Sequence, residues 1–246
     1  MAHLNEKNQI VGGLGNLIFR VVNGKIVVQT RPDYSQVKQT QSTQKAASDF
    51  GKASQVAKKI SYGCQQIIQG YHSPEMATRL RSKVLQAMRT HASLPLGRKD
   101  LWSGTPELLE GFEFNKHSPY KDNSELWTLN WELDSQRRIH FKQKAFTPKN
   151  HLYWLPRAES LQICYWICAF QKKDYKPCQQ QLLTLTVSPD FVEVPMQNFE
   201  SEVFPEGCLI IICVSMFYYR SDAIIGGNLL NHKKFHPARI LKIVKT

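Results

Sequence analysis

The chain has 246 residues, of which 42% are hydrophobic and 21% charged, and its formal net charge is +12. Glycine and proline together account for 25 residues, so the composition is that of a globular protein and excludes a collagen-like or disordered chain. Apolar runs fall far short of the ~20 residues that a membrane-spanning helix needs, and the first residues lack the basic-then-apolar order of a signal peptide. We therefore expect a cytoplasmic protein.

Positive charge is concentrated in the first part of the chain. Residues 1–99 hold 15 Lys and Arg against 4 Asp and Glu, whereas residues 100–246 hold 17 against 16. This asymmetry predicts that the first part faces an acidic partner, such as nucleic acid or another anionic surface. The alternative is that the basic surface only keeps the protein in solution.

Residues 12–31 predict a β-hairpin, because two β-branched runs flank Asn23-Gly24, the pair best suited to a type I′ turn. A two-residue turn would pair Val22 with Lys25. One face would then carry the apolar side chains of Leu17, Phe19, Val21, Ile26 and Val28. The other would carry Arg20, Lys25, Gln29 and Arg31, with Ile18, Val22 and Val27 between them. An isolated hairpin is marginally stable in water, so its apolar face should pack on the rest of the chain or on a neighbouring subunit.

A helix is predicted to begin near Ser42. Its apolar positions follow strict 4-3 spacing, which is typical of a narrow helix-packing seam, and comprise Ala46, Phe50, Ala53, Ala57, Ile60, Cys64 and Ile67. Lysines repeat every seven residues beside this seam, at Lys38, Lys45, Lys52 and Lys59. A second amphipathic pattern over 73–91 predicts a return helix, so residues 41–92 are expected to form an antiparallel helical hairpin.

Proline and glycine at 95–106 interrupt the helical pattern, and we expect a boundary there between domains 1–104 and 105–246. From about residue 111 the pattern predicts strands at 112–115, 125–133, 138–146, 161–171, 182–188, 191–195 and 208–219, with a further strand in the C-terminal tail. About seven short strands with regular turns are typical of an antiparallel, immunoglobulin-like sandwich. The predicted fold class is therefore α+β, with a β-hairpin and helical hairpin followed by a β-sandwich.

Motifs that carry chemistry are weak. The glycines at 12–15 precede a hairpin rather than a helix, so they are expected to be flexible backbone and not a phosphate loop. His232 and His236 lack the Glu of an HExxH motif. The six cysteines form no CxxC pair and are expected to be reduced and buried. Because no nucleophile motif or convincing carboxylate pair occurs either, we expect a non-enzymatic protein without metal or cofactor.

Two functions fit these patterns. The first is a structural or assembly protein, a homo-oligomer or part of a larger assembly. Its subunit contacts would be Leu17, Phe19, Val21, Ile26, Val28, Phe50, Ala53 and Ala57. The second is a basic nucleic-acid-binding module that would use Arg20, Lys25, Arg31, Lys38, Lys45, Lys52 and Lys59 to neutralise phosphates. A plain monomer, in which the sandwich covers both the hairpin and the helix seam, is the alternative to assembly.

The N-terminal pattern resembles the signature of an uncharacterised Bacteroidetes family. The matching stretches are Gly12 to Asn16, Asn23-Gly24-Lys25, Val27-Val28, Arg31-Pro32 and Thr40 to Phe50, with further similarity at Gly111 to Asn115 and Phe204 to Gly207. The resemblance implies a short glycine-asparagine hairpin, a helix and a β-rich remainder. It implies no activity and no catalytic residue.

Overall fold

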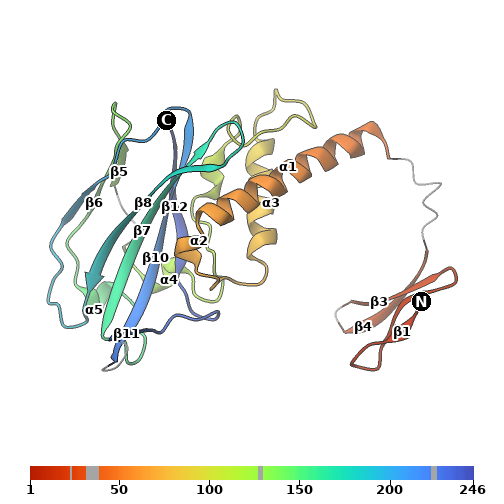
Figure 1. Cartoon of the computed structure of the whole chain (residues 1–246), viewed down its shortest axis with the longest axis horizontal. Coiled ribbons are helices and arrows are strands. Elements are labelled where there is room, and N and C mark those ends of the chain that lie inside the picture. The colour runs from red at the N-terminus through yellow and green to blue at the C-terminus, as the bar shows by residue number, and fades with distance from the viewer. Residues whose placement is uncertain (23, 32–38, 127–129, 223–225) are drawn as a thin grey trace. The chain divides into compact units, whose positions relative to one another are not determined.

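The structure is a computed structural model, and it describes residues 1–22, 24–31, 39–126, 130–222 and 226–246. The fold is α+β with antiparallel sheets, as the sequence predicts (Figure 1). The chain divides into two compact units, Met1–Gln44 and Lys45–Thr246.

The first unit is a four-stranded antiparallel sheet with strand order β1-β2-β3-β4. Its strands are β1 (His3–Leu4), β2 (Ile10–Leu14), β3 (Leu17–Val22) and β4 (Lys25–Thr30). The predicted hairpin is β3 and β4, and its predicted register is confirmed by the pairing of Val22 with Lys25 and of Phe19 with Val28. Asn23 of the predicted turn lies outside the described residues.

The glycine-rich stretch at 12–15 differs from the expected flexible entry to the hairpin. Gly12 and Gly13 belong to strand β2, which pairs with β3, and Gly15 takes a positive φ in the turn between them. A Cβ on Gly12 would lie 2.6 Å from the backbone oxygen of Met1, so this position accepts only glycine. The hairpin is therefore part of a larger sheet.

A five-stranded antiparallel sheet forms the centre of the second unit. It comprises β7 (Ser160–Gln171), β8 (Pro177–Val187), β10 (Cys208–Asp222), β11 (Gly226–Leu229) and β12 (Ala238–Lys245). The strand predicted in the tail is confirmed as β12. The central strands β7 and β10 are almost continuously apolar because both faces of the sheet are covered.

Helices lie on one side of this sheet (Figure 1), namely α1 (Gln41–Gly63), α2 (Gln65–Ile68) and α3 (Met76–Arg89), and α3 packs against η1 (Pro106–Leu109). Alternate side chains of β7, such as Trp166 and Phe170, share a core cluster with Ala53, Ile60 and Leu80 of the helices. The Trp166 indole Nε1 donates a hydrogen bond of 2.7 Å to the Gly63 carbonyl. The C-terminal end of α1 therefore packs on the sheet, and the apolar seam belongs to a core shared with α3 and the sheet.

A three-stranded sheet, β5 (Asn130–Leu133), β6 (Ile139–Gln143) and β9 (Gln197–Glu200), covers the other face. Phe141 of β6 packs on Tyr165 of β7, with ring centroids 4.9 Å apart. Short helices complete the unit: η1 (Pro106–Leu109), α4 (Tyr120–Asn123) and α5 (Pro148–His151).

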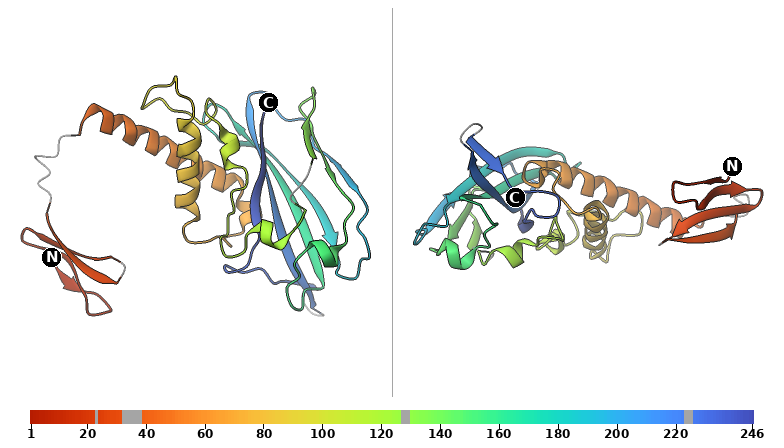
Figure 2. Two further views of the ribbon diagram at one scale, coloured as in Figure 1. Left: turned by 180° about the vertical axis from the view of Figure 1, so that it is seen from behind. Right: turned by 90° about the horizontal axis from the view of Figure 1, so that it is seen from below.

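Several sequence predictions need correction. Both views of Figure 2 show α3 crossing α1, rather than the antiparallel hairpin predicted for 41–92. The apolar stripe of α3 packs against η1 and shares a core cluster with α1 and the central sheet. Residues 112–115 and 191–195 form only isolated bridges, at Glu113 and Val194, while β9 and β11 were not predicted. The boundary predicted at 104 lies inside the second unit, since Leu101 and Leu109 belong to one core cluster.

Candidate functional site

The apolar side chains of the first unit converge on one face of its sheet. Residues paired across antiparallel strands point to the same side, so the pairs Leu4 with Ile10, Leu14 with Leu17, and Phe19 with Val28 share one face. This apolar sheet face comprises Leu4, Ile10, Leu14, Leu17, Phe19, Val21, Ile26 and Val28. It contains all five hairpin residues predicted for a subunit interface, and β1 and β2 extend it.

The apolar sheet face is unusually accessible for side chains of this kind. None of the described residues between 1 and 31 is buried. Leu4 and Leu14 expose 61% and 62% of their surface, and Val28 exposes 50%. Four strands with one such face form a sheet that lacks a hydrophobic core of its own, and a patch of this kind marks an interaction surface.

The opposite face of this sheet is mixed in character. The register places Arg20 with Val27 and Val22 with Lys25 on this side, away from the apolar sheet face. Arg31 follows β4, and its backbone N–H donates to the Asn16 carbonyl at 2.7 Å. Of the cations predicted to meet an acidic partner, Arg20 and Lys25 therefore share one sheet face.

The predicted interface residues of α1 do not form a second contact surface. Ala53 and Ala57 are buried in the core of their own chain, which makes them inaccessible to a neighbouring subunit and corrects their assignment. Phe50 is 45% exposed, and the Arg81 guanidinium lies 4.6 Å from its ring centroid. The seam pattern indicated correctly that a helix face is buried, but that face is buried in the core of its own chain.

The predicted row of lysines lies along one side of α1. The Lys45 side chain packs near Gly97, the Lys52 ammonium donates to the Gly97 carbonyl at 2.8 Å, and Lys59 donates to the Asp174 carbonyl. Lys38 lies outside the described residues. Lys52 and Lys59 thus reach segments far away in the sequence.

These two lysines line a pocket of about 330 Å³, which we name the basic pocket. Its walls come from α1, from the segment 98–101 and from the turn 173–175. The lining residues are Lys52, Gln55, Val56, Lys59, Met88, Arg98, Lys99, Asp100, Leu101, Lys173, Asp174 and Tyr175. The sequence pattern did not predict Arg98, Lys99 or Lys173 as site residues, because they come from separate segments without a shared spacing.

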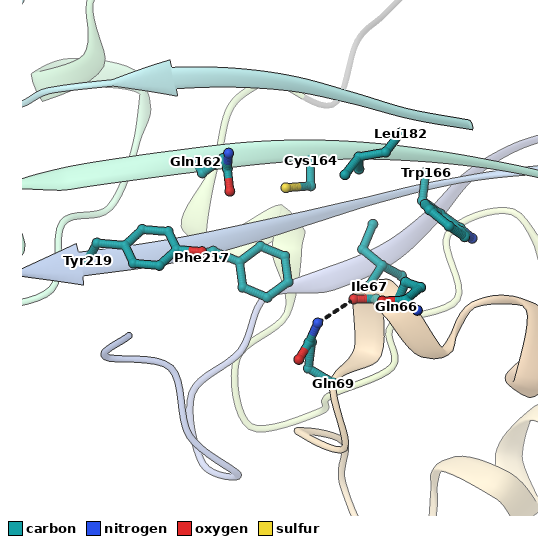
Figure 3. Close-up of a pocket in the computed structure, with 9 residues that line it drawn as sticks. All are labelled: Gln66, Ile67, Gln69, Gln162, Cys164, Trp166, Leu182, Phe217 and Tyr219. Atoms are coloured by element: carbon teal, nitrogen blue, oxygen red, sulfur yellow. Dashed lines mark hydrogen bonds between the residues drawn. The ribbon is translucent and has the colours of Figure 1, made fainter. Parts of the chain in front are cut away.

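A pocket of about 240 Å³ opens between α2 and the central sheet (Figure 3). Three carboxamides and three aromatic rings line it together with apolar side chains: Gln66, Gln69, Gln162, Trp166, Phe217, Tyr219, Ile67, Cys164 and Leu182. None of these nine residues is charged, and burial raises the pKa of the Cys164 thiol to about 12. The thiol therefore stays protonated near neutral pH, and the pocket holds no activated nucleophile.

Ser215, His236 and Asn231 lie together in the arrangement of a nucleophile, a base and an orienting residue. Ser215 Oγ is 3.3 Å from His236 Nε2, and Asn231 Nδ2 is 2.9 Å from His236 Nδ1. However, Nε2 also lies 2.8 Å from the Ile67 carbonyl, which only accepts hydrogen bonds, so Nε2 carries the proton. His236 cannot then take a proton from Ser215, and because all three side chains are buried the cluster is structural.

The described part of the chain also bears on metal sites, membrane-spanning helices and cysteines. No group of three or more His, Cys, Asp or Glu side chains there is arranged to hold a metal ion. Within the same residues, no helix combines the length and the hydropathy needed to cross a bilayer. The thiols are free, and five of the six are buried as predicted, whereas Cys178 is exposed.

Comparison with protein-family models, with curated proteins and with solved structures finds no match to this chain.

Proposed function

We propose that the chain is a non-enzymatic assembly protein, in which the apolar sheet face of one copy packs on the same face of a second copy. The observation that carries this proposal is the accessibility of that face within a unit that buries none of its described residues 1–31. The face holds no charged side chain, so two identical faces complement each other. A two-fold pair is also the commonest closed arrangement of identical subunits.

The expected strength of this contact follows from its exposed side chains. Complete burial of a Val, Leu or Ile side chain contributes about 1.5–3 kcal/mol. Six members of the face are already 40–62% exposed, so covering them on two sheets contributes roughly 10–15 kcal/mol. Association costs about 4–15 kcal/mol. We therefore expect a reversible assembly that depends on protein concentration.

Two adjacent valines of β4 provide a matched test of the proposed interface. Val28 lies on the apolar sheet face and is 50% exposed, whereas Val27 lies on the opposite face and is 41% exposed. Val28→Asp should reduce the assembly to monomers, because dimerisation would bury an unpaired carboxylate. Val27→Asp should retain the mass of the unaltered protein. Size exclusion with light scattering measures both masses.

The proposal fails if the unaltered chain is monomeric at high concentration, or if Val28→Asp retains the oligomer. Phe19→Asp, on the same face of β3, provides an independent second variant. All five tryptophans lie at positions 102–166, so their fluorescence reports separately that the second unit is folded.

Nucleic-acid binding is the second proposed function. It is supported by the positions of Lys45, Lys52 and Lys59 along one side of α1 and by the positive charge of residues 1–99. Binding should weaken steeply with salt. Charge reversal by Lys45→Glu combined with Lys52→Glu should lower the affinity for nucleic acid at a given salt concentration. An unchanged affinity in that variant would argue against this function.

The two antiparallel sheets of residues 130–246, with aromatic side chains between them, are consistent with a β-sandwich. The immunoglobulin-like topology stays a proposal.

A further inference from the structure

The basic pocket has an excess of positive charge. Five cations line it, against two carboxylates: Lys52, Lys59, Arg98, Lys99 and Lys173, with Asp100 and Asp174. None of the five forms an ion pair with a carboxylate of the described residues. Five cations against two carboxylates leave an excess of positive charge, and a bound anion would reduce the repulsion among the cations.

Both carboxylates of the pocket already have other partners. Asp174 forms an ion pair of 3.3 Å with Lys176, which is outside the pocket lining. Asp100 accepts hydrogen bonds from the Tyr175 hydroxyl at 2.9 Å and from the Ser103 N–H at 3.0 Å. The two acidic groups therefore leave the lysines available for a ligand.

Backbone carbonyls hold three of the ammonium groups in place. Lys52 donates to Gly97, Lys59 donates to Asp174, and Lys99 donates to His91 at 2.6 Å. Each ammonium has three N–H groups, so two remain free after one backbone hydrogen bond. Cations positioned in advance lose less side-chain freedom when a ligand binds.

A buried carboxylate fixes the loop that contributes Arg98 and Lys99. Asp49 of α1 is fully buried and accepts the backbone N–H of Gly97 at 2.8 Å and that of Lys99 at 3.1 Å. Lys52 binds the Gly97 carbonyl from the same helix. These hydrogen bonds therefore fix the position of the loop relative to α1, and with it the positions of Arg98 and Lys99 relative to Lys52.

We propose that the basic pocket binds a compact anion that carries two or three linked phosphates. Lys52 and Lys59 are seven residues apart on α1, about 10.5 Å along the helix axis. Their ammonium groups donate to two different carbonyls, those of Gly97 and Asp174, so they present two separate positions for anionic groups. Linked phosphates can span this distance, and the Arg98 guanidinium is suited to bidentate phosphate contacts. The site is a concave pocket with a volume in the range of small-ligand sites, which favours a small polyanion over a nucleic-acid strand.

The test measures binding of inorganic tripolyphosphate to the full chain by isothermal titration calorimetry. Lys52→Gln combined with Lys59→Gln should weaken binding by about 10-fold or more, since each removes a charge-assisted hydrogen bond. Lys58→Gln is the matched control, because Lys58 neighbours Lys59 on α1 but lines a different pocket. Its affinity should remain that of the unaltered chain.

Three results with small anions would overturn the proposal, and a fourth would come from competition with an oligonucleotide. These are no binding of tripolyphosphate to the folded chain, an equal loss in Lys58→Gln, or equal affinity for citrate, which would indicate attraction to any polyanion. An oligonucleotide of about 20 nucleotides that displaces tripolyphosphate at much lower concentration would assign the site to nucleic acid instead. Val28 does not line the basic pocket. Val28→Asp should therefore leave tripolyphosphate binding unchanged, so that the proposed assembly and the proposed ligand are tested independently.

Discussion

Two titratable groups, the largely buried Glu113 and the fully buried His236, should give the stability of the second unit opposing dependences on pH. Burial raises the pKa of Glu113 to about 7, although the Tyr120 N–H donates to its carboxylate at 2.8 Å and Arg239 lies 3.7 Å away. Burial also lowers the pKa of His236 to about 4, because the ring is enclosed and its charged form is disfavoured. The perturbation that separates the two is Glu113→Gln, which keeps an acceptor for the Tyr120 N–H and removes the titration.

The signs follow from proton binding. The raised pKa of Glu113 means that the folded state holds this proton more tightly, so its contribution is complete below about pH 4.5 and is lost as the pH rises to about 7. The lowered pKa of His236 means that its contribution is present above about pH 6.5 and is lost as the pH falls to about 4. Each group changes the unfolding free energy by about 3 kcal/mol across its pH range. The two effects largely cancel between about pH 4.5 and 6.5.

Urea unfolding followed by tryptophan fluorescence tests this prediction at several values between about pH 4.5 and 7.5. As the pH rises over that range, the unfolding free energy of Glu113→Gln should increase by about 3 kcal/mol relative to that of the unaltered chain. Below pH 6.5 the variant alone should lose stability steeply, because the His236 effect is no longer offset. A difference in unfolding free energy between the two proteins that stays constant with pH would show that Glu113 does not titrate with a raised pKa.

Two further substitutions test contacts of the second unit. Trp166→Phe removes the indole N–H that donates to the buried Gly63 carbonyl. The free energy of unfolding in urea should therefore fall by about 1–3 kcal/mol. An unchanged value would show that this hydrogen bond contributes nothing to stability. Asp49→Ala removes the acceptor for the N–H groups of Gly97 and Lys99, so trypsin should cleave the native chain faster after Arg98. Equal cleavage rates in both proteins would contradict a role for Asp49 in fixing this loop.

The sequence predicted the hairpin of the first unit well because its determinants are local. An Asn-Gly turn fixes which residues pair, and the two-residue period of a strand then fixes which side chains share a face. Strand β2 was missed because Gly12 and Gly13 interrupt the apolar alternation that identifies a strand. The positive φ of Gly12 and its contact with Met1 become visible only when β1 is in place.

The covering of α1 could not be predicted in the same way. A 4-3 apolar spacing shows that one helix face is buried but not which element buries it, so Ala53 and Ala57 were assigned to a neighbour although they lie in the core of their own chain. The basic pocket was predicted in part for a similar reason. The seven-residue repeat identified Lys52 and Lys59, whereas Arg98, Lys99 and Lys173 join them only through the tertiary fold.

Amide hydrogen exchange measured over a dilution series tests whether a second copy covers the apolar sheet face. At about 100 µM the amides of β3 and β4 should exchange slowly, and on dilution to about 1 µM they should lose protection as the copies separate. The amides of β7 and β10 should remain protected throughout, since the core of the second unit covers them. Protection of β3 and β4 that does not change with concentration would contradict the assembly account.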